Sequence, residues 1–175
     1  MPDLAMLRVL DLPALAQGEG VLEGRVEAAA LDRLWEDLNG DAQPVQAIAW
    51  RIFVQWREFT GQPAQLWMHL QARAQLPLTC QRCLGPVLQP VPVDRFFRFV
   101  DSEEEAQAQD EDCEEDLLVL EKRFDFLELL EDELLLELPL VPMHERCPQD
   151  LSVHAGPLES PAHPFAALAR LKKPN

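Results

Sequence analysis

The chain has 175 residues, of which 47 % are hydrophobic, so it is long enough and apolar enough to bury the core of one globular domain. Its net charge of −16 argues against a general phosphate-binding surface, which needs clustered cations, and favours basic protein partners. Its four unevenly spaced cysteines, the lack of an apolar run of ~20 residues and the lack of a signal-peptide pattern lead us to expect a cytoplasmic protein.

The negative charge is concentrated in one stretch. Residues Asp101 to Asp116 contain ten of the 31 acidic side chains and no Lys or Arg. The rest of the chain then has 21 acidic and 15 basic residues, which is an ordinary balance. Such a charge density favours a mobile, solvated segment, so the sequence predicts a disordered acidic loop here.

The N-terminal part predicts one strand and one helix. After an apolar opening at Leu4–Leu10, the alternation over Val21–Ala28 is typical of a strand. Leu31, Leu34 and Leu38 follow at helical spacing, and Asn39-Gly40 supplies a stop signal.

Two longer alternating segments follow. Residues 45–58 place Trp50, Ile52 and Val54 on one face, and residues 65–76 alternate in the same way after the turn Thr60–Pro63. This pattern predicts a long antiparallel hairpin with one wet face. Trp67 and His69 lie on that polar face, where they are either a binding surface or cross-strand packing.

A Cys-x-x-Cys turn, Cys80 to Cys83, separates this hairpin from a further predicted strand at Val87–Val100. Proline cannot donate a ladder hydrogen bond, so three prolines near the start of this strand indicate an edge position or a bulge there. These residues are Pro86, Pro90 and Pro92.

A second helix is predicted at Asp125–Leu138, with Asp125 as its cap and Pro139 as its end. Its acidic residues, among them Glu128, Glu131 and Glu137, are expected on a solvated face. An extended segment at Val141–Cys147 follows, and residues 148–175 read as a loop-like tail ending in a short basic amphipathic segment.

Together these elements predict an α+β domain with a mainly antiparallel sheet and two covering helices. We expect a single domain over residues 1–147, with the acidic mobile loop at 101–116 inside it and the tail at 148–175 outside it.

The chemistry of the Cys turn has three readings. Cys80 and Cys83 combine with His144 and Cys147, a His-x-x-Cys pair, into a three-sulfur, one-nitrogen set suited to zinc. A thiol oxidoreductase is the second reading, although the turn leads into a strand where a redox Cys-x-x-Cys would open a helix. Ordinary reduced thiols are the third. Cys113, among carboxylates, is expected to be neither nucleophile nor ligand.

Several stretches in one order resemble the YceD family, the bacterial large ribosomal RNA accumulation proteins. They are Leu78–Cys83, the acidic helix running into Glu137–Pro142 with His144 and Cys147, and the tail Pro164–Leu168 with Leu171-Lys172. The resemblance spans roughly residues 20–173. It implies a role in synthesis, processing or stability of large-subunit ribosomal RNA, without a known enzymatic activity.

The sequence has no phosphate-binding loop, Gly-x-Ser-x-Gly motif or nucleotide-binding glycine fingerprint, so we expect a non-enzymatic protein. Its expected partner is a ribosomal protein or a large-subunit RNA precursor, with no membrane and no small-molecule substrate. Direct RNA capture would require Arg82, Arg95, Arg98 and the tail lysines to form one basic face. The expected partner-binding residues are Arg82, Phe165, Leu168, Arg170, Lys172 and Lys173.

Overall fold

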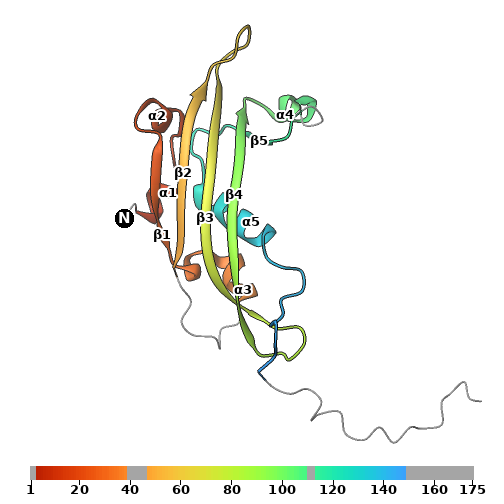
Figure 1. Ribbon diagram of the computed structural model, residues 1–175. Helices are drawn as coiled ribbons and strands as arrows, with labels where there is room; N and C mark the ends of the chain where they lie inside the picture. The colour runs from red at the N-terminus through yellow and green to blue at the C-terminus, as the bar shows by residue number, and fades with distance from the viewer. Residues whose placement is uncertain (1–2, 39–46, 110–112, 149–175) are drawn as a thin grey trace, which may run out of the picture. The chain divides into compact units, whose positions relative to one another are not determined.

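The computed structural model describes residues 3–38, 47–109 and 113–148 (Figure 1). Its centre is a five-stranded sheet in the order β1-β2-β3-β4-β5. The first four strands pair antiparallel with their neighbours, and β5 pairs parallel to β4. This confirms the predicted α+β class. The strands are β1 Val21–Val26, β2 Ile48–Arg57, β3 Gln65–Thr79, β4 Pro86–Val100 and β5 Asp116–Val119.

Two of the helices match the sequence prediction. The helix expected at residues 31–38 is α3, Asp32–Asp37, and the helix expected at 125–138 is α5, Phe126–Leu136. Two short helices were not predicted: α1, Leu4–Leu7, in the apolar opening, and α2, Leu12–Gln17, which follows it. The side chains of Asp3 and Asp11 cap them. A 3-10 turn at Ala28–Ala30 leads into α3.

The sheet has one covered face and one open face. In β2 the side chains of Ile48, Trp50, Ile52 and Val54 are buried, whereas the residues between them are exposed or half-buried. The same alternation runs along β3. The buried residues pack with Leu12, Leu34, Phe126 and other apolar side chains of the helices, so the core lies between the helices and this face. Figure 1 shows α3 and α5 on that side of the strands.

Helix α5 has its own N-terminal cap and also supplies the cap of α3. The Asp125 side chain accepts a hydrogen bond from the Glu128 amide, as the predicted cap requires. The prediction for Glu131 is wrong: this residue is only 8 % exposed, and its carboxylate accepts from the backbone N–H of Leu34 and from Arg33. Since Leu31 offers α3 no side-chain cap, Glu131 supplies one from a distant element.

The prolines of β4 lie where the sequence placed them. β4 pairs with β3 along its whole length, but β5 covers only residues 97–100 of its other side. Pro86, Pro90 and Pro92 are therefore in the part of β4 that has no second neighbour among the described strands, where a missing N–H costs no ladder hydrogen bond.

The acidic stretch is not a plain loop. Residues Glu103–Gln109 form helix α4, and β5 begins at Asp116. The Ser102 hydroxyl accepts from the Glu105 amide, and three acidic residues lie in the first turn, which is the favourable end of the helix dipole. Residues 110–112 lie outside the described residues. The sequence prediction therefore missed a helix whose N-terminal signals the sequence contains.

By their contacts, the described residues up to His144 form one compact unit, and the described residues from Glu145 to Pro148 are assigned to a second unit. Among the described residues, no helix has the length and apolar character needed to cross a membrane.

Candidate metal centre at the turn between β3 and β4

The Cys turn is held by two backbone hydrogen bonds. The Cys80 amide donates to the Gly85 carbonyl at 2.8 Å, and the Leu84 amide donates to the Cys80 carbonyl at 2.8 Å. Leu84 follows Cys83 and has φ of 58°, in the left-handed region that a leucine rarely adopts. Such strain persists only where the surrounding structure fixes it, and it clusters at ligand sites. The turn thus fixes the spacing of its two thiols.

The segment before His144 docks on this turn. The Gln81 amide donates to the Pro142 carbonyl at 2.9 Å, and the Gln89 side chain donates to the Met143 carbonyl at 3.3 Å. Sequence reasoning missed both glutamines, because these contacts join residues more than fifty positions apart and no local pattern reports them. They bring the His144 ring beside Cys83.

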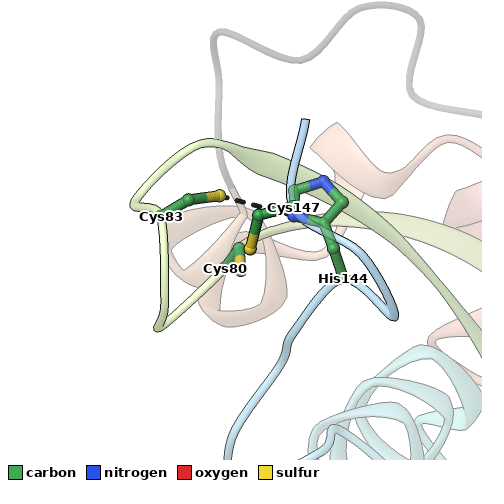
Figure 2. A group of neighbouring side chains, drawn as sticks. All are labelled: Cys80, Cys83, His144 and Cys147. Atoms are coloured by element: carbon green, nitrogen blue, oxygen red, sulfur yellow. Dashed lines mark hydrogen bonds between the residues drawn. The ribbon is translucent and has the colours of Figure 1, made fainter. Parts of the chain in front are cut away.

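The donor atoms of Cys80, Cys83, His144 and Cys147 lie within 4.8 Å of one another (Figure 2). The Cys83 sulfur lies 3.4 Å from His144 Nδ1. Sulfurs bound to one tetrahedral zinc ion at ~2.3 Å are themselves about 3.8 Å apart, so the group has the size of a zinc shell. The structure thus brings together the metal-ligand set proposed from the sequence, in a group able to hold a metal ion.

The electrostatics of Cys80 suit a ligand. Burial of its side chain acts to raise the pKa of the thiol. Backbone hydrogen bonds from His144, Cys83 and Arg82, and the His144 side chain, outweigh this effect and lower the pKa from 9.0 to about 5. The thiolate is therefore the form present at neutral pH, and the thiolate is what binds metals.

A lowered thiol pKa is also expected of a redox cysteine, so the pKa alone does not separate the two chemistries. The surroundings do: a redox pair needs one attacking and one resolving sulfur, whereas this turn adds an imidazole and a third thiol. The turn also leads into β4 and not into a helix, as the sequence indicated. The donor set therefore favours metal binding.

The residues proposed for partner binding, and the fourth cysteine, do not belong to this donor group. Arg82 is exposed, and its guanidinium contacts the Met143 sulfur at 3.8 Å. Cys113 is not part of this donor group, and its thiol contacts the Glu115 carbonyl. The five tail residues lie outside the described residues: Phe165, Leu168, Arg170, Lys172 and Lys173.

The basic face that direct RNA capture would require does not form around Arg95 and Arg98. Arg95 contacts Asp116 and Glu133, and Arg98 is 6 % exposed and contacts Glu115 at 2.6 Å. Both guanidinium groups are occupied by carboxylates, so neither is available to phosphate.

The fold is thus an α+β sheet with one open face, and its β3–β4 turn contributes to a Cys₃His group that could hold a metal ion. Residues 68–172, more than half of the chain, match the family described as Large ribosomal RNA subunit accumulation protein YceD. The chain therefore belongs to the YceD family, as its motifs indicated. The match includes β4, the Cys turn and α5. No solved structure matches the chain.

Proposed function

We propose that this protein is a non-enzymatic cytoplasmic factor that supports the synthesis, processing or stability of large-subunit ribosomal RNA. The family match over residues 68–172 carries the proposal, since the family is named for accumulation of that RNA. The direct partner is a ribosomal protein or a precursor RNA.

Gene deletion tests this role. We expect the ratio of large-subunit to small-subunit ribosomal RNA to fall, and the full chain supplied from a plasmid to restore it. An unchanged ratio in the deletion strain would remove the proposal.

We place the partner contacts on Arg82 and on the basic tail residues Phe165, Leu168, Arg170, Lys172 and Lys173. Arg82 is an exposed residue of the docked turn, and the tail adds three cations to an acidic chain. Truncation after Pro164 should weaken co-sedimentation with large-subunit precursors, increasingly so as salt is raised, and Arg82→Ala should weaken it further. Unaltered co-sedimentation of both variants would place the contacts elsewhere.

We further propose that zinc is held by Cys80, Cys83, His144 and Cys147 in a structural role. Four protein ligands leave no open position for substrate, which is the pattern of structural sites. In this role the ion ties the segment around His144 to the β3–β4 turn.

Metal analysis of the purified full chain should give one zinc per molecule. Cys147→Ser should lower this content and the melting temperature, whereas Cys113→Ser is the matched control outside the donor group and should change neither. Removal of zinc by a chelator should lower the melting temperature of the parent protein and leave that of Cys80→Ser unchanged. Equal metal content in the parent protein and in Cys80→Ser would refute the site.

A further inference from the structure

The open face of the sheet carries aromatic side chains in a row across three strands. Phe53 of β2 lies opposite His69 of β3, and His69 lies opposite Phe96 of β4. The His69 and Phe96 rings stack in parallel, with centroids 4.0 Å apart and planes 9° apart. Phe53 is 38 % and Phe96 44 % exposed, which is unusual for large apolar side chains in the middle of a sheet.

Cations surround this row. Arg57 places its guanidinium 4.1 Å from the centre of the Trp67 ring, one position from the row on the same face. On the other side of the row, the pairing register puts Arg51 beside Gln71 and Arg73 beside Ala49. Arg25 lies opposite Ala49 at the β1 edge. The open face thus combines flat rings with flanking guanidinium groups.

The charge of this face is opposite to that of the chain. The cations on its strands are Arg25, Arg51, Arg57, Arg73 and Arg98, and the carboxylates on its strands are Glu23 and Asp94. Arg98 is paired with Glu115 at 2.6 Å, and Glu114 and Glu115 lie at that end of the face. Arg51 lies 3.9 Å from Glu23, but both side chains are more than half exposed, so this loose pair leaves the Arg51 guanidinium open to phosphate. The Asp94 carboxylate is engaged by His69 at 2.6 Å and by Gln71 at 3.1 Å. Away from Glu114 and Glu115, the face therefore carries more cations than carboxylates on a chain of net charge −16, and this local excess favours an anionic ligand there.

The two ends of the open face differ in the side chains that line them. At its Arg98 end is a hollow that Glu114 and Glu115 line together with Arg57, Arg98 and Trp67, and the two carboxylates disfavour phosphate there. At the other end Ala49 lines a hollow of about 270 Å³ with Arg51, Arg73 and Asp94 on its rim. An anionic chain lying on the aromatic row would therefore continue toward the arginines and away from α4.

From this placement we propose that the open face of β1–β4 binds single-stranded segments of RNA, with unpaired bases stacked on Phe53, His69 and Phe96 and phosphates on Arg51 and Arg73. Aromatic side chains stack on any base, and a positive surface follows the backbone, which is how single strands are held without base-edge readout. Paired bases are already stacked on each other and leave no ring face for Phe53 or Phe96. The inference rests on the proposed function, which it deepens by naming RNA as the partner.

Fluorescence anisotropy with labelled single-stranded RNA of mixed sequence, and with the same RNA annealed to its complement, tests this proposal on the full chain. The single strand should bind at least about tenfold more tightly than the duplex. Phe53→Ala combined with Phe96→Ala should weaken single-strand binding about tenfold or more. Trp35→Ala, an exposed aromatic on α3, is the matched control and should bind as the parent protein does.

Arg51→Gln with Arg73→Gln should lower the slope of log affinity against log salt by about 1.4, since each phosphate contact on a single strand contributes about 0.7. Lys122→Gln with Arg123→Gln, two exposed cations outside the sheet, should leave the slope unchanged. Equal binding of single strand and duplex, or unchanged binding by the Phe53/Phe96 variant, would overturn the inference. So would binding of a purified ribosomal protein, but not RNA, to this face.

Complementation separates the two proposals. If the parent protein restores large-subunit ribosomal RNA and the Phe53/Phe96 variant restores it equally, the stacking face is wrong while the proposed function stands. If deletion of the gene leaves that RNA unchanged, the proposed function is wrong whatever the RNA affinity.

Discussion

The two faces of strands β2–β4 share one backbone but carry different chemistry. The face toward the helices is apolar and closed, with Ile52, Leu70 and Phe97 each at most 1 % exposed. The opposite face carries exposed aromatic rings, glutamines and arginines. Since neighbouring residues of a strand point to opposite faces, adjacent positions report on stability and on binding separately. This alternation lets single substitutions address one property at a time.

Adjacent phenylalanines in β4 provide the largest contrast. Phe97 is 1 % exposed, so we expect Phe97→Ala to cost about 3–5 kcal/mol of unfolding free energy through lost burial and a cavity. Phe96 is 44 % exposed, and we expect Phe96→Ala to cost less than about 1 kcal/mol, mainly its stack on His69. Urea denaturation measures both. Equal losses would mean that the open face is packed against something in solution.

The buried cap of α3 ranks next. Glu131→Ala leaves the Leu34 amide without its acceptor and Arg33 with one carboxylate fewer, so we expect a loss of about 1–3 kcal/mol. Asp132→Ala is the matched control, because Asp132 also contacts Arg33 but its side chain is 45 % exposed. There the loss should stay under about 1 kcal/mol. A larger loss of stability for Asp132→Ala than for Glu131→Ala would contradict our assignment of Glu131 as the cap.

Glu133, on the covered side, should make the free energy of unfolding rise as the pH falls from 7. Burial raises the pKa of its carboxyl above 4.5, against the lowering effect of Arg95. The folded state therefore takes up the proton first as pH falls, and folding gains stability in the range between the raised pKa and 4.5. Relative to Glu133→Gln, the parent protein should become more stable as pH is lowered from 7 through this range.

Asp94, on the open face, should have the opposite effect to Glu133: its contribution to stability is lost as the pH falls. This is the smallest effect that we predict. Hydrogen bonds from His69 and then Gln71 lower the pKa of its carboxyl below 3.8. This contribution to stability is present above pH 3.8 and is lost as pH falls through the lowered pKa. The side chain is 63 % exposed, so solvent screening keeps the effect small. Thermal melts of Asp94→Asn and the parent protein should therefore converge only in strong acid; convergence already at pH 5 would contradict this.

The candidate metal set shows where sequence reasoning succeeds and where it stops. Cys-x-x-Cys and His-x-x-Cys are local spacings with a known chemical use, so the sequence alone identifies Cys80, Cys83, His144 and Cys147 as candidate ligands. Their convergence depends on Gln81 and Gln89, whose contacts with Pro142 and Met143 have no signature in local sequence.

The sequence determined the elements whose signals are local. Alternation over β1–β4, the Asp125 cap of α5, the prolines of the β4 edge and the wet position of Trp67 and His69 all follow from the side-chain periodicity of strands and from backbone hydrogen bonding. The acidic helix α4 escapes this reasoning because its charge density favours a solvated loop, even though its N-terminal signals favour a helix.

Only the tertiary structure decided which side chains from distant parts of the sequence contact one another. It buried Glu131 as the cap of α3, occupied Arg95 and Arg98 with carboxylates, and aligned Phe53, His69 and Phe96 across three strands. The physical reason is that the register between strands and the docking of helices set which side chains meet, and these depend on the whole core, whereas the periodicity of one strand depends only on its own residues.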